Sequence, residues 1–428
     1  MRIGICGAGT VASGVVSILQ DSKGLEARLG SSAIQIAAMA SRRASDNPVF
    51  AGIPFELDVF AMPSRADIDV IVELIGGIDD ALRLVKAALS EGKSVVTANK
   101  ALLAHHGAEL MALAQSQGVS LLFEAAVCGG IPIIKALNES FVGNNVRGIA
   151  GIINGTTNFI LTKMAEPGAN ASFETVLSEA QRLGYAEADP TFDIGGMDAA
   201  HKLAIMAALA FDEPLQIDQV FTEGIQEIDG EDLKWAERLG YRVKHLGIAL
   251  ADDTSLEMRV HPALVPDQSQ LASIQGVTNA VNVLARPVGE TLFTGPGAGA
   301  GPTGSSVVSD LFDLARGAPT RPPQSLSEDR GSRKAKSMLE TKSGWMVRLS
   351  VRDRPGMMSQ VGSILADHGL SIDQIQQRDA PDGTTTVVMI LDSAVERDFQ
   401  ASLTALKSHP DVMPGARAIR VFDPESIG

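Results

Sequence analysis

The sequence predicts an α/β protein, and three observations lead to this prediction. A short apolar strand at the N-terminus runs directly into a glycine-rich turn and a helix. Strands and helices then alternate as far as about residue 130, a pattern typical of a mostly parallel, doubly wound sheet. Residues 344–428 follow the order βαββαβ, which predicts a small ferredoxin-like unit.

The first strand is expected over residues 2–6, and Gly7-Ala8-Gly9-Thr10-Val11-Ala12 follows it. Gly7 permits the tight turn, and Gly9 lets the backbone approach a phosphate group at the N-terminus of the next helix. Ala12 stands where the GxGxxG pattern has its third glycine, a replacement that the pattern tolerates. This segment predicts a Rossmann-like dinucleotide-binding domain.

The second strand, over residues 34–40, ends at Ser41-Arg42-Arg43. NAD-preferring domains usually have an acidic residue at this position. A hydroxyl group followed by two guanidinium groups suits the 2′-phosphate of NADP, so we expect NADP, with NAD as the second choice. The alternative interpretation is that both arginines simply belong to a solvated loop.

Lys100 follows a strand that we expect over residues 94–97. Ligands of open α/β sheets bind at the carboxyl ends of the strands, which makes Lys100 a candidate cation of the site. It is equally well explained as a surface lysine at the start of a helix. Other strands of this sheet are expected over residues 69–74 and 119–123, with a helix over residues 80–91.

Residues 295–304 are the richest glycine run of the chain and precede a helix expected over residues 305–315. The run either returns the chain to the first domain or forms a second backbone surface over the cofactor. Cofactor contacts are expected at Gly7, Gly9, Thr10, Val11, Ala12, Ser41, Arg42, Arg43, Gly76, Thr97, Asn99, Lys100 and Gly297.

The middle of the chain has a different pattern, which predicts an α+β domain with a mixed sheet and helices on one side. Its strands are expected over residues 147–153, 241–251, 256–262, 276–284 and 289–294. The predicted division of the chain is residues 1–130 with 295–316 for the dinucleotide-binding domain, 131–294 for the catalytic and dimerisation domain, 317–343 for a linker and 344–428 for the third domain.

Asp198 and Lys202 lie four residues apart on a helix that we expect over residues 197–211, so they share one helix face. Spacing alone indicates a surface salt bridge. The residues after Lys202 are almost wholly apolar, which suggests that the helix is buried. A charge pair on a buried helix is costly unless it has a task, so the pair is a candidate for catalysis.

Composition excludes several classes of function. The formal net charge of −15 argues against nucleic acid or an anionic membrane as a partner. Cys6 and Cys128 lie in apolar or glycine-rich surroundings, so we expect free thiols and a cytoplasmic location. No apolar run reaches membrane-spanning length, and no Cys/His spacing indicates zinc.

Several motifs, in order along residues 1–315, resemble those of the homoserine dehydrogenase family, and the tail with Asp353-Arg354-Pro355-Gly356 is similar to an ACT domain. The motifs are GICGAGTVASGVV, VELIGG, VVTANKALLA, FEAAVCGGIPII, GIINGTTNFIL, GYAEADPTFDIGGMDAAHKLAI and GPGAGAGPTGSSVVSDL. The resemblance implies reversible NAD(P)H-dependent reduction of L-aspartate 4-semialdehyde to L-homoserine, in the biosynthesis of threonine, methionine and isoleucine.

The resemblance also implies roles for individual residues. Lys100 and Lys202 match the two active-site lysines of the family, Asp198 the carboxylate beside one of them, and Glu187 the acid that holds the substrate amine. Further substrate contacts are expected at Gly155 and Thr156. Hydride delivery to an aldehyde leaves an alkoxide, which a lysine can protonate and stabilise. We expect Lys202 to be this donor, although the two lysines could exchange roles.

A monovalent-cation site, for sodium or potassium, is also implied by the resemblance. Its ligands would be Glu124 and the carbonyl groups of Val127, Gly129 and Ile131. One departure concerns Thr294, which stands where many members of the family have tyrosine.

The ACT-like tail implies a small-molecule sensor, with L-threonine as the natural effector. A homodimer or homotetramer is the expectation from the family. Two alternatives to the main hypothesis are another amino-acid dehydrogenase on the same architecture and a non-catalytic amino-acid sensor. The second would be expected to have lost a lysine, and this chain keeps both Lys100 and Lys202.

Overall fold

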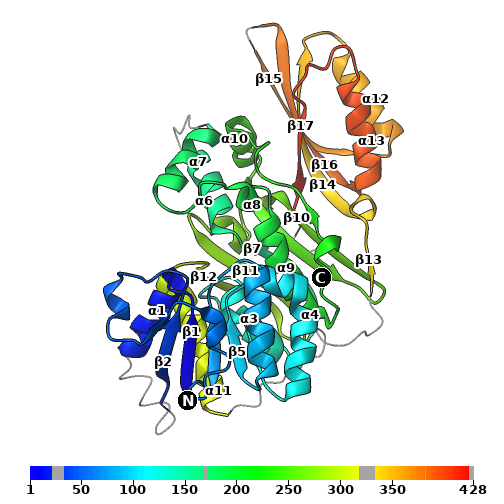
Figure 1. Ribbon diagram of the computed structural model, residues 1–428. Helices are drawn as coiled ribbons and strands as arrows, with labels where there is room; N and C mark the ends of the chain where they lie inside the picture. Colours follow the sequence, from blue (N-terminus) through cyan, green and yellow to red (C-terminus); the bar gives the residue numbers. More distant parts are fainter. Residues whose placement is uncertain (22–32, 167–171, 318–332, 381, 424–428) are drawn as a thin grey trace.

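A six-stranded parallel sheet forms the first domain of the computed structural model, which describes residues 1–21, 33–166, 172–317, 333–380 and 382–423 (Figure 1). The strand order is β3-β2-β1-β4-β5-β6. The strands are β1 (Arg2–Cys6), β2 (Gln35–Ala40), β3 (Phe55–Glu56), β4 (Val70–Glu73), β5 (Ser94–Thr97) and β6 (Leu121–Leu122). All neighbouring strands run parallel, which confirms the predicted doubly wound sheet.

Helices cover both faces of this sheet. Its four helices in the described residues are α1 (Thr10–Gln20), α3 (Asp79–Ser90), α4 (Lys100–Gln117) and α11 (Ala300–Ala315). α1 packs against α11 on one face, and α3 packs against α4 on the other. A Cβ atom on Gly14 would lie 1.8 Å from the Ala300 carbonyl oxygen, so only glycine lets α1 and α11 approach this closely.

The glycine run at residues 295–304 therefore leads the chain back to the first domain. This was one of its two interpretations from the sequence. The helix begins at Ala300 rather than at the predicted residue 305. Its first turn contains Gly301 and Pro302, which the sequence analysis assigned to a loop. Proline is tolerated there because the first N–H groups of a helix have no partner within the helix.

The second sheet has eleven strands and includes the C-terminal unit. Its order is β12-β11-β7-β9-β10-β17-β14-β16-β15, with β8 and β13 also paired to β10. The strands are β7 (Asn145–Ile152), β8 (Phe221–Thr222), β9 (Tyr241–Ala251), β10 (Ser255–Pro266), β11 (Thr278–Arg286), β12 (Gly289–Pro296), β13 (Lys334–Ala335), β14 (Lys342–Arg352), β15 (Ile372–Asp379), β16 (Thr384–Val395) and β17 (Arg417–Val421).

The join between the two parts of this sheet is a parallel pairing of β10 with β17, at Ala263–Arg420 and Leu264–Val421. The C-terminal unit thus continues the sheet of the second domain by main-chain hydrogen bonds, although the sequence suggested a separate unit. Of the predicted linker, residues 318–332 lie outside the described residues. The following residues of the predicted linker contact the second domain, because β13 pairs with β10.

The helices of the second and third domains include α9 (Met197–Phe211), whose bounds agree with the prediction. It contacts β9 and β10 on one side and α4 of the first domain on the other (Figure 1). The others are α5 (Ile133–Lys135), α6 (Gly155–Met164), α7 (Phe173–Arg182), α8 (Thr191–Ile194), α10 (Gly230–Arg238), α12 (Met357–Asp367) and α13 (Glu396–Lys407). No helix within the described ranges is long and apolar enough to cross a membrane.

Candidate active site

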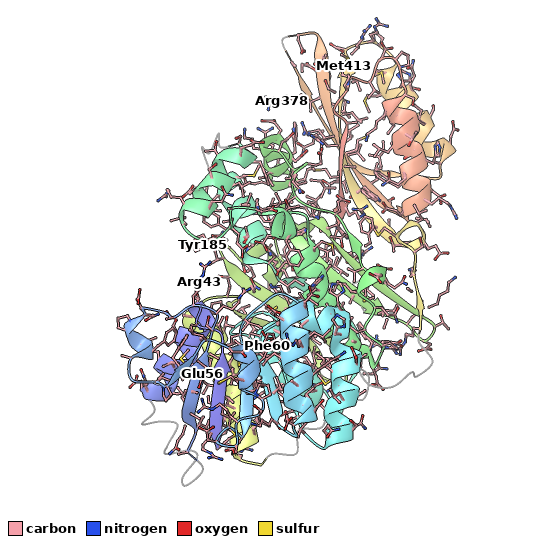
Figure 2. The ribbon with its side chains drawn as sticks, in the orientation of Figure 1. Arg43, Glu56, Phe60, Tyr185, Arg378 and Met413 are labelled. Carbon is pink, nitrogen blue, oxygen red and sulfur yellow. The ribbon has the colours of Figure 1, made fainter. Side chains whose placement is uncertain are left out.

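Three cavities follow one another along the edge of the first sheet where its strands end. The arginine cavity, of about 440 Å³, is lined by the glycine turn at Gly7 and Gly9 together with Ser41, Arg42 and Arg43. Asp58 and Asp80 also line it. Figure 2 shows Arg43 at the upper edge of the first domain. The structure therefore brings the predicted phosphate-binding turn and the predicted specificity residues together.

The glycine-turn cavity, also of about 440 Å³, comes next and shares Gly9 and Gly76 with the arginine cavity. Thr10, Val11, Asn99 and Lys100 also line it. α1 begins here without a side-chain cap, so its first amide groups are available to a phosphate.

The backbone of the glycine turn depends on its two glycines. Gly7 has a φ of +121°, and a Cβ atom there would lie 2.4 Å from the Leu74 carbonyl oxygen. Above Gly9, a Cβ atom would meet no atom within 4 Å. The turn is therefore tight on one side and open to a ligand on the other, as the sequence predicted.

Thr97 and Ala12, both expected at the cofactor, are instead buried. The Thr97 hydroxyl donates to Glu73 Oε2 over 2.5 Å. Glu73 Oε1 accepts from the amides of Ile75 and Gly76, over 2.9 and 3.3 Å. Burial raises the pKa of Glu73 above its usual value. Glu73 thus holds the loop after β4, which lines the glycine-turn cavity. Its bond to Thr97 joins β4 to β5 over 24 residues, and no local pattern predicts it.

The central cavity, of about 550 Å³, lies between the two sheets and continues from the glycine-turn cavity through Val11, Ala98, Lys100 and Glu187. Asp198 and Lys202 line its floor from α9, and both are buried. Predicted residues that also line it are Gly155, Thr156 and Gly297.

Asp198 lies between two lysines. Its Oδ2 is 2.7 Å from Lys202 Nζ, and its Oδ1 is 3.2 Å from Lys100 Nζ. Lys202 Nζ also donates to the Ile153 carbonyl over 2.8 Å. Because Asp198 is only 5% exposed and Lys202 9%, the surface salt-bridge interpretation is wrong. The interpretation of Lys100 as a plain surface lysine is also wrong, because it pairs with a buried acid.

This arrangement determines the charges of the pair. Burial penalises the charged Asp198 carboxylate, but the attraction of Lys202 and Lys100 outweighs it and lowers its pKa. Burial is the largest single effect on Lys202 and would lower its pKa, but the attraction of Asp198 and the hydrogen bond to it, with the smaller effects of Cys128 and Asp193, together outweigh burial, and the pKa is raised. Lys202 is thus an ammonium ion at neutral pH.

Asn154 is a further residue of the site, and the sequence motifs predicted no role for it. Its Nδ2 donates to Asp193 Oδ1 over 2.9 Å and to Asp198 Oδ2 over 2.8 Å. Its Oδ1 accepts from the Thr157 amide and caps α6. An asparagine at this position signals the helix cap, but nothing local indicates the bridge between two acids. Burial, followed by the charge of Asp198, raises the pKa of Asp193.

Thr156 and Glu187 both line the central cavity, the first buried and the second exposed. The Thr156 hydroxyl donates to the Tyr185 carbonyl over 2.6 Å, which ties α6 to the acidic loop. Glu187 is exposed at the mouth of the cavity, and Gln181 Nε2 donates to its carbonyl over 3.0 Å. The carboxylate of Glu187 is therefore accessible to a cationic group of a ligand.

The predicted cation ligands are already used by protein donors. The Glu124 carboxylate accepts from the amides of Ile134 and Lys135, over 2.9 and 2.8 Å. The Gly129 carbonyl accepts from Ser306 Oγ, and the Ile131 carbonyl from the Ile133 amide. Each of these oxygen atoms accepts one hydrogen bond and keeps a further lone pair, so the monovalent-cation site stays a prediction. The predicted Val127 carbonyl belongs to the same loop.

Comparisons with known proteins show the family to which the chain belongs. Residues 7–124 match the family model of the homoserine dehydrogenase NAD-binding domain, residues 132–312 that of homoserine dehydrogenase, and residues 345–411 that of the ACT domain. Homoserine dehydrogenase of Pseudomonas aeruginosa is 42% identical over 433 residues, which cover 98% of each chain. That of Neisseria gonorrhoeae is 44% identical over 423 residues, which cover 95% of each.

Solved structures lead to the same result. A homoserine dehydrogenase from Thiobacillus denitrificans has a TM-score of 0.91 and 40% identity, with 100% of this chain and 99% of that chain covered. A hyperthermophilic archaeal homoserine dehydrogenase in complex with NADPH has a TM-score of 0.63 and 26% identity, over 75% of this chain and 99% of that one. The chain therefore belongs to the homoserine dehydrogenase family and is an oxidoreductase acting on a CH–OH group, with an NAD-binding domain and an ACT domain.

Proposed function

We propose that the chain catalyses the reversible NADP(H)-dependent reduction of L-aspartate 4-semialdehyde to L-homoserine. The observation that carries this proposal is the position of Asp198 between Lys100 and Lys202, in a cavity that continues into the glycine turn. Residues 1–130 with 295–316 would bind the cofactor, and residues 131–294 would bind the substrate.

Lys202 is the proposed proton donor. Bound NADPH would supply the hydride. Lys202, held by Asp198 and the Ile153 carbonyl, donates its proton to the oxygen on which negative charge develops. In the opposite direction its neutral amine accepts the hydroxyl proton. The raised pKa of Lys202 favours the acid role, which belongs to the reduction.

The other site residues would bind and orient. Lys100 borders both the glycine-turn cavity and the central cavity, so it is placed to contact cofactor and substrate together. Glu187, exposed at the mouth, would hold the substrate ammonium by charge. Gly155 and Thr156, at the start of α6, would contact the amino-acid end of the substrate.

NADP is the proposed cofactor, rather than NAD, because Ser41, Arg42 and Arg43 line the cavity beside the glycine turn. The archaeal relative in complex with NADPH is consistent with this choice. In steady-state assays NADP(H) should be used at least as well as NAD(H). A strong preference for NADH would contradict the assignment of these arginines.

The decisive assay follows NADP⁺ reduction by absorbance with L-homoserine, beside L-aspartate and other amino alcohols. Turnover with L-homoserine and none with the others supports the proposal. Turnover with a different amino alcohol alone would identify another amino-acid dehydrogenase, and no turnover with any would favour a non-catalytic sensor.

We also propose that L-threonine inhibits the enzyme through the ACT domain, and a chain of contacts supports this. Arg420 on β17 is paired with Glu223 at 2.8 Å. His245 Nε2 donates to the Glu223 carbonyl over 3.0 Å. The His245 ring lies against Gly196, where α9 begins, since a Cβ atom there would be 3.3 Å from its Cε1. The contacts therefore run from the ACT domain to the helix of Asp198.

Threonine titration of the intact chain and of Arg420→Met tests this route. Inhibition of the intact chain that weakens in the variant is the expected result. Equal inhibition of both proteins would show that the Arg420 contact does not carry the inhibition. An intact chain that threonine does not inhibit would exclude threonine as the effector. A homodimer or homotetramer and a cytoplasmic location stay predictions from the sequence.

A further inference from the structure

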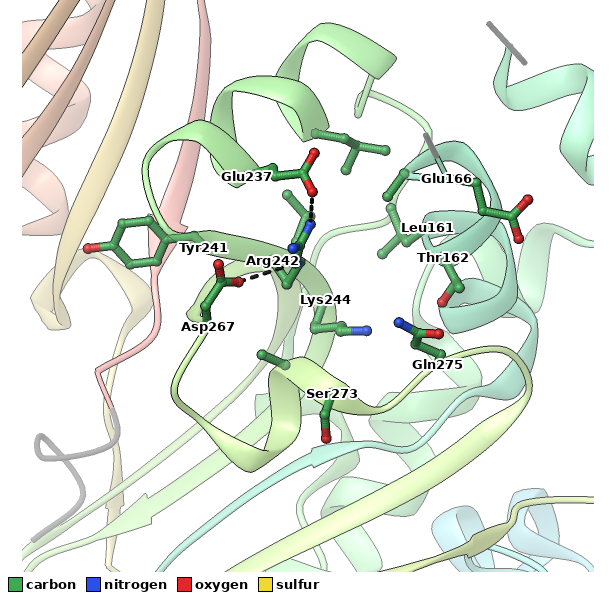
Figure 3. A pocket seen from close by; sticks show the side chains of 14 residues that line it. Leu161, Thr162, Glu166, Glu237, Tyr241, Arg242, Lys244, Asp267, Ser273 and Gln275 are labelled. Atoms are coloured by element: carbon green, nitrogen blue, oxygen red, sulfur yellow. Dashed lines mark hydrogen bonds and ion pairs between the residues drawn. The ribbon is translucent and has the colours of Figure 1, made fainter. Parts of the chain in front are cut away.

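A further cavity, of about 570 Å³, lies in the second domain away from the three described above (Figure 3). It is enclosed by the end of α6, by α10, by the beginning of β9 and by the turn over residues 270–275. It shares no lining residue with the central cavity. A volume of this size suits a small organic ligand. We call it the Lys244 cavity.

Lys244 is the chemical centre of this cavity. Its side chain is only 5% exposed. Nζ donates to the Ile274 carbonyl, and Lys244 and Gln275 point toward one another across the cavity (Figure 3). Among the described residues no salt bridge includes Lys244. A buried ammonium ion that lacks an opposite charge is unfavourable, so an anion placed here would be bound strongly.

The three acids that line this cavity are each paired with a cation other than Lys244. Arg242 lies 2.6 Å from Glu237 and 3.2 Å from Asp267, and Figure 3 shows both pairs at one side of the cavity. Glu166 is paired with Lys163 at 2.9 Å. No carboxylate among the described residues is therefore in contact with Lys244, and a ligand carboxylate could take that place, although Arg242 alone serves both Glu237 and Asp267.

Neutral donors and an apolar wall complete the cavity. The Thr162 hydroxyl oxygen accepts from the Gly276 amide over 3.2 Å, so its own proton is free for an acceptor. Gln275 supplies a side-chain amide. The wall is aliphatic and consists of Leu161, Ala165, Leu233, Val243 and Ala272. The cavity thus combines a cationic end with a surface for a short hydrocarbon chain.

We propose that the Lys244 cavity binds a small aliphatic carboxylate. The carboxylate accepts hydrogen bonds from Lys244, Thr162 and Gln275, and the hydrocarbon part packs on the aliphatic wall. Charge-assisted hydrogen bonds supply most of the affinity, and the wall selects for chain length.

Calorimetric titration of the whole protein with isovalerate, acetate and the neutral isovaleramide tests this proposal. Isovalerate should bind saturably, and isovaleramide should bind about tenfold or more weakly because it lacks the charge. Acetate should also bind more weakly, because it leaves the wall uncovered. Equal binding of the amide would overturn the role of the charge, and equal binding of acetate would overturn that of the wall.

Variants identify the site of binding. Lys244→Met should weaken isovalerate binding about tenfold or more, whereas Lys234→Met, which removes an exposed lysine of α10, should leave it unchanged. Lys202→Met should also leave it unchanged, since the central cavity is separate. Binding that disappears in Lys202→Met and persists in Lys244→Met would assign the ligand to the active site and end the proposal.

The wild-type protein provides a second readout if Lys244→Met does not fold. Burial, followed by the charge of Arg242, lowers the pKa of Lys244 to about 8. Isovalerate should therefore bind with proton uptake near this pH and more weakly above it. The other titratable groups that line the cavity are Glu166, Glu237, Tyr241, Arg242 and Asp267. An affinity that is constant from about pH 7 to about pH 9.5 would contradict the role of Lys244.

Discussion

Lys202 in the central cavity and Lys244 in the Lys244 cavity are both buried, and each amino group donates to a backbone carbonyl. They differ in one neighbour. Lys202 has Asp198 at 2.7 Å, and the pKa of Lys202 is raised. Lys244 has no such acid among the described residues, and its pKa is lowered to about 8.

This difference shows that burial alone does not determine the protonation state of a lysine. Desolvation is the largest effect at both sites and lowers the pKa at both. An opposite charge in contact reverses the result at Lys202 only. A lysine with its own carboxylate can hold a proton ready for transfer, and a lysine without one is suited to binding an anion.

The largest expected effect comes from removing the amino group of the central cavity. Lys202→Met should lower kcat on the order of a hundredfold or more, with little change in the KM for NADP⁺, because only the proton transfer is lost. Steady-state kinetics measures this. Lys163→Met, which removes a half-buried lysine outside the central cavity, is the control. A kcat for Lys202→Met within a few-fold of wild type would disprove the donor role.

Removing the Asp198 carboxylate should make the pKa of Lys202 more like that of Lys244. In Asp198→Asn the desolvated Lys202 loses its attracting charge, so its pKa should fall. The pH–rate profiles of both directions should shift to lower pH, and kcat should fall on the order of tenfold at neutral pH. A profile that stays in place would show that Asp198 does not control the lysine.

Asn154 allows the position of the acid to be changed while its charge is kept. Asn154→Ser keeps a helix-capping hydroxyl but loses both bonds from Nδ2 to Asp193 and Asp198. We expect kcat to fall about tenfold with thermal stability close to wild type. Asn154→Ala should lose the same activity and also about 1 kcal/mol of stability. Full activity in Asn154→Ser would leave Asn154 a capping residue only.

The smallest expected effect is on the pH dependence of folding stability. Its sign at Lys244 is opposite to its sign at Lys202. Folded Lys244 releases its proton near pH 8, whereas an unfolded lysine keeps it to about pH 10.4. Between these values the unfolded state binds more protons, so stability rises with pH. The contribution of Lys202, whose folded pKa is raised, is instead complete below the unfolded value and lost as pH rises through the folded one.

Thermal melts of wild type and Lys244→Met should show this. The difference in melting temperature in favour of the variant should be largest near pH 7 and should shrink by several degrees as pH rises through about 8 to 10. A difference that does not depend on pH would mean that Lys244 is not desolvated in the folded protein.

Local patterns predicted much of the site. The glycine turn, the end of β2 at Ser41-Arg42-Arg43 and the bounds of α9 were all expected, because each depends on residues close together in the chain. The bridge of Asn154 between two acids and the pairing of β10 with β17 were not expected. Their partners lie far apart in the sequence, and no spacing rule joins them.

The sequence by itself determined that Lys202 has an acid four residues before it on the same helix face, and that Lys244 lies within a strand expected over residues 241–251. The tertiary structure decided that both amino groups are buried, and that Lys100 approaches Asp198 from the other domain. It also placed Arg242 against the nearby acids and left Lys244 without one. The physical reason is that a pKa depends on every charge and solvent boundary around a group, and these come together only when distant segments pack.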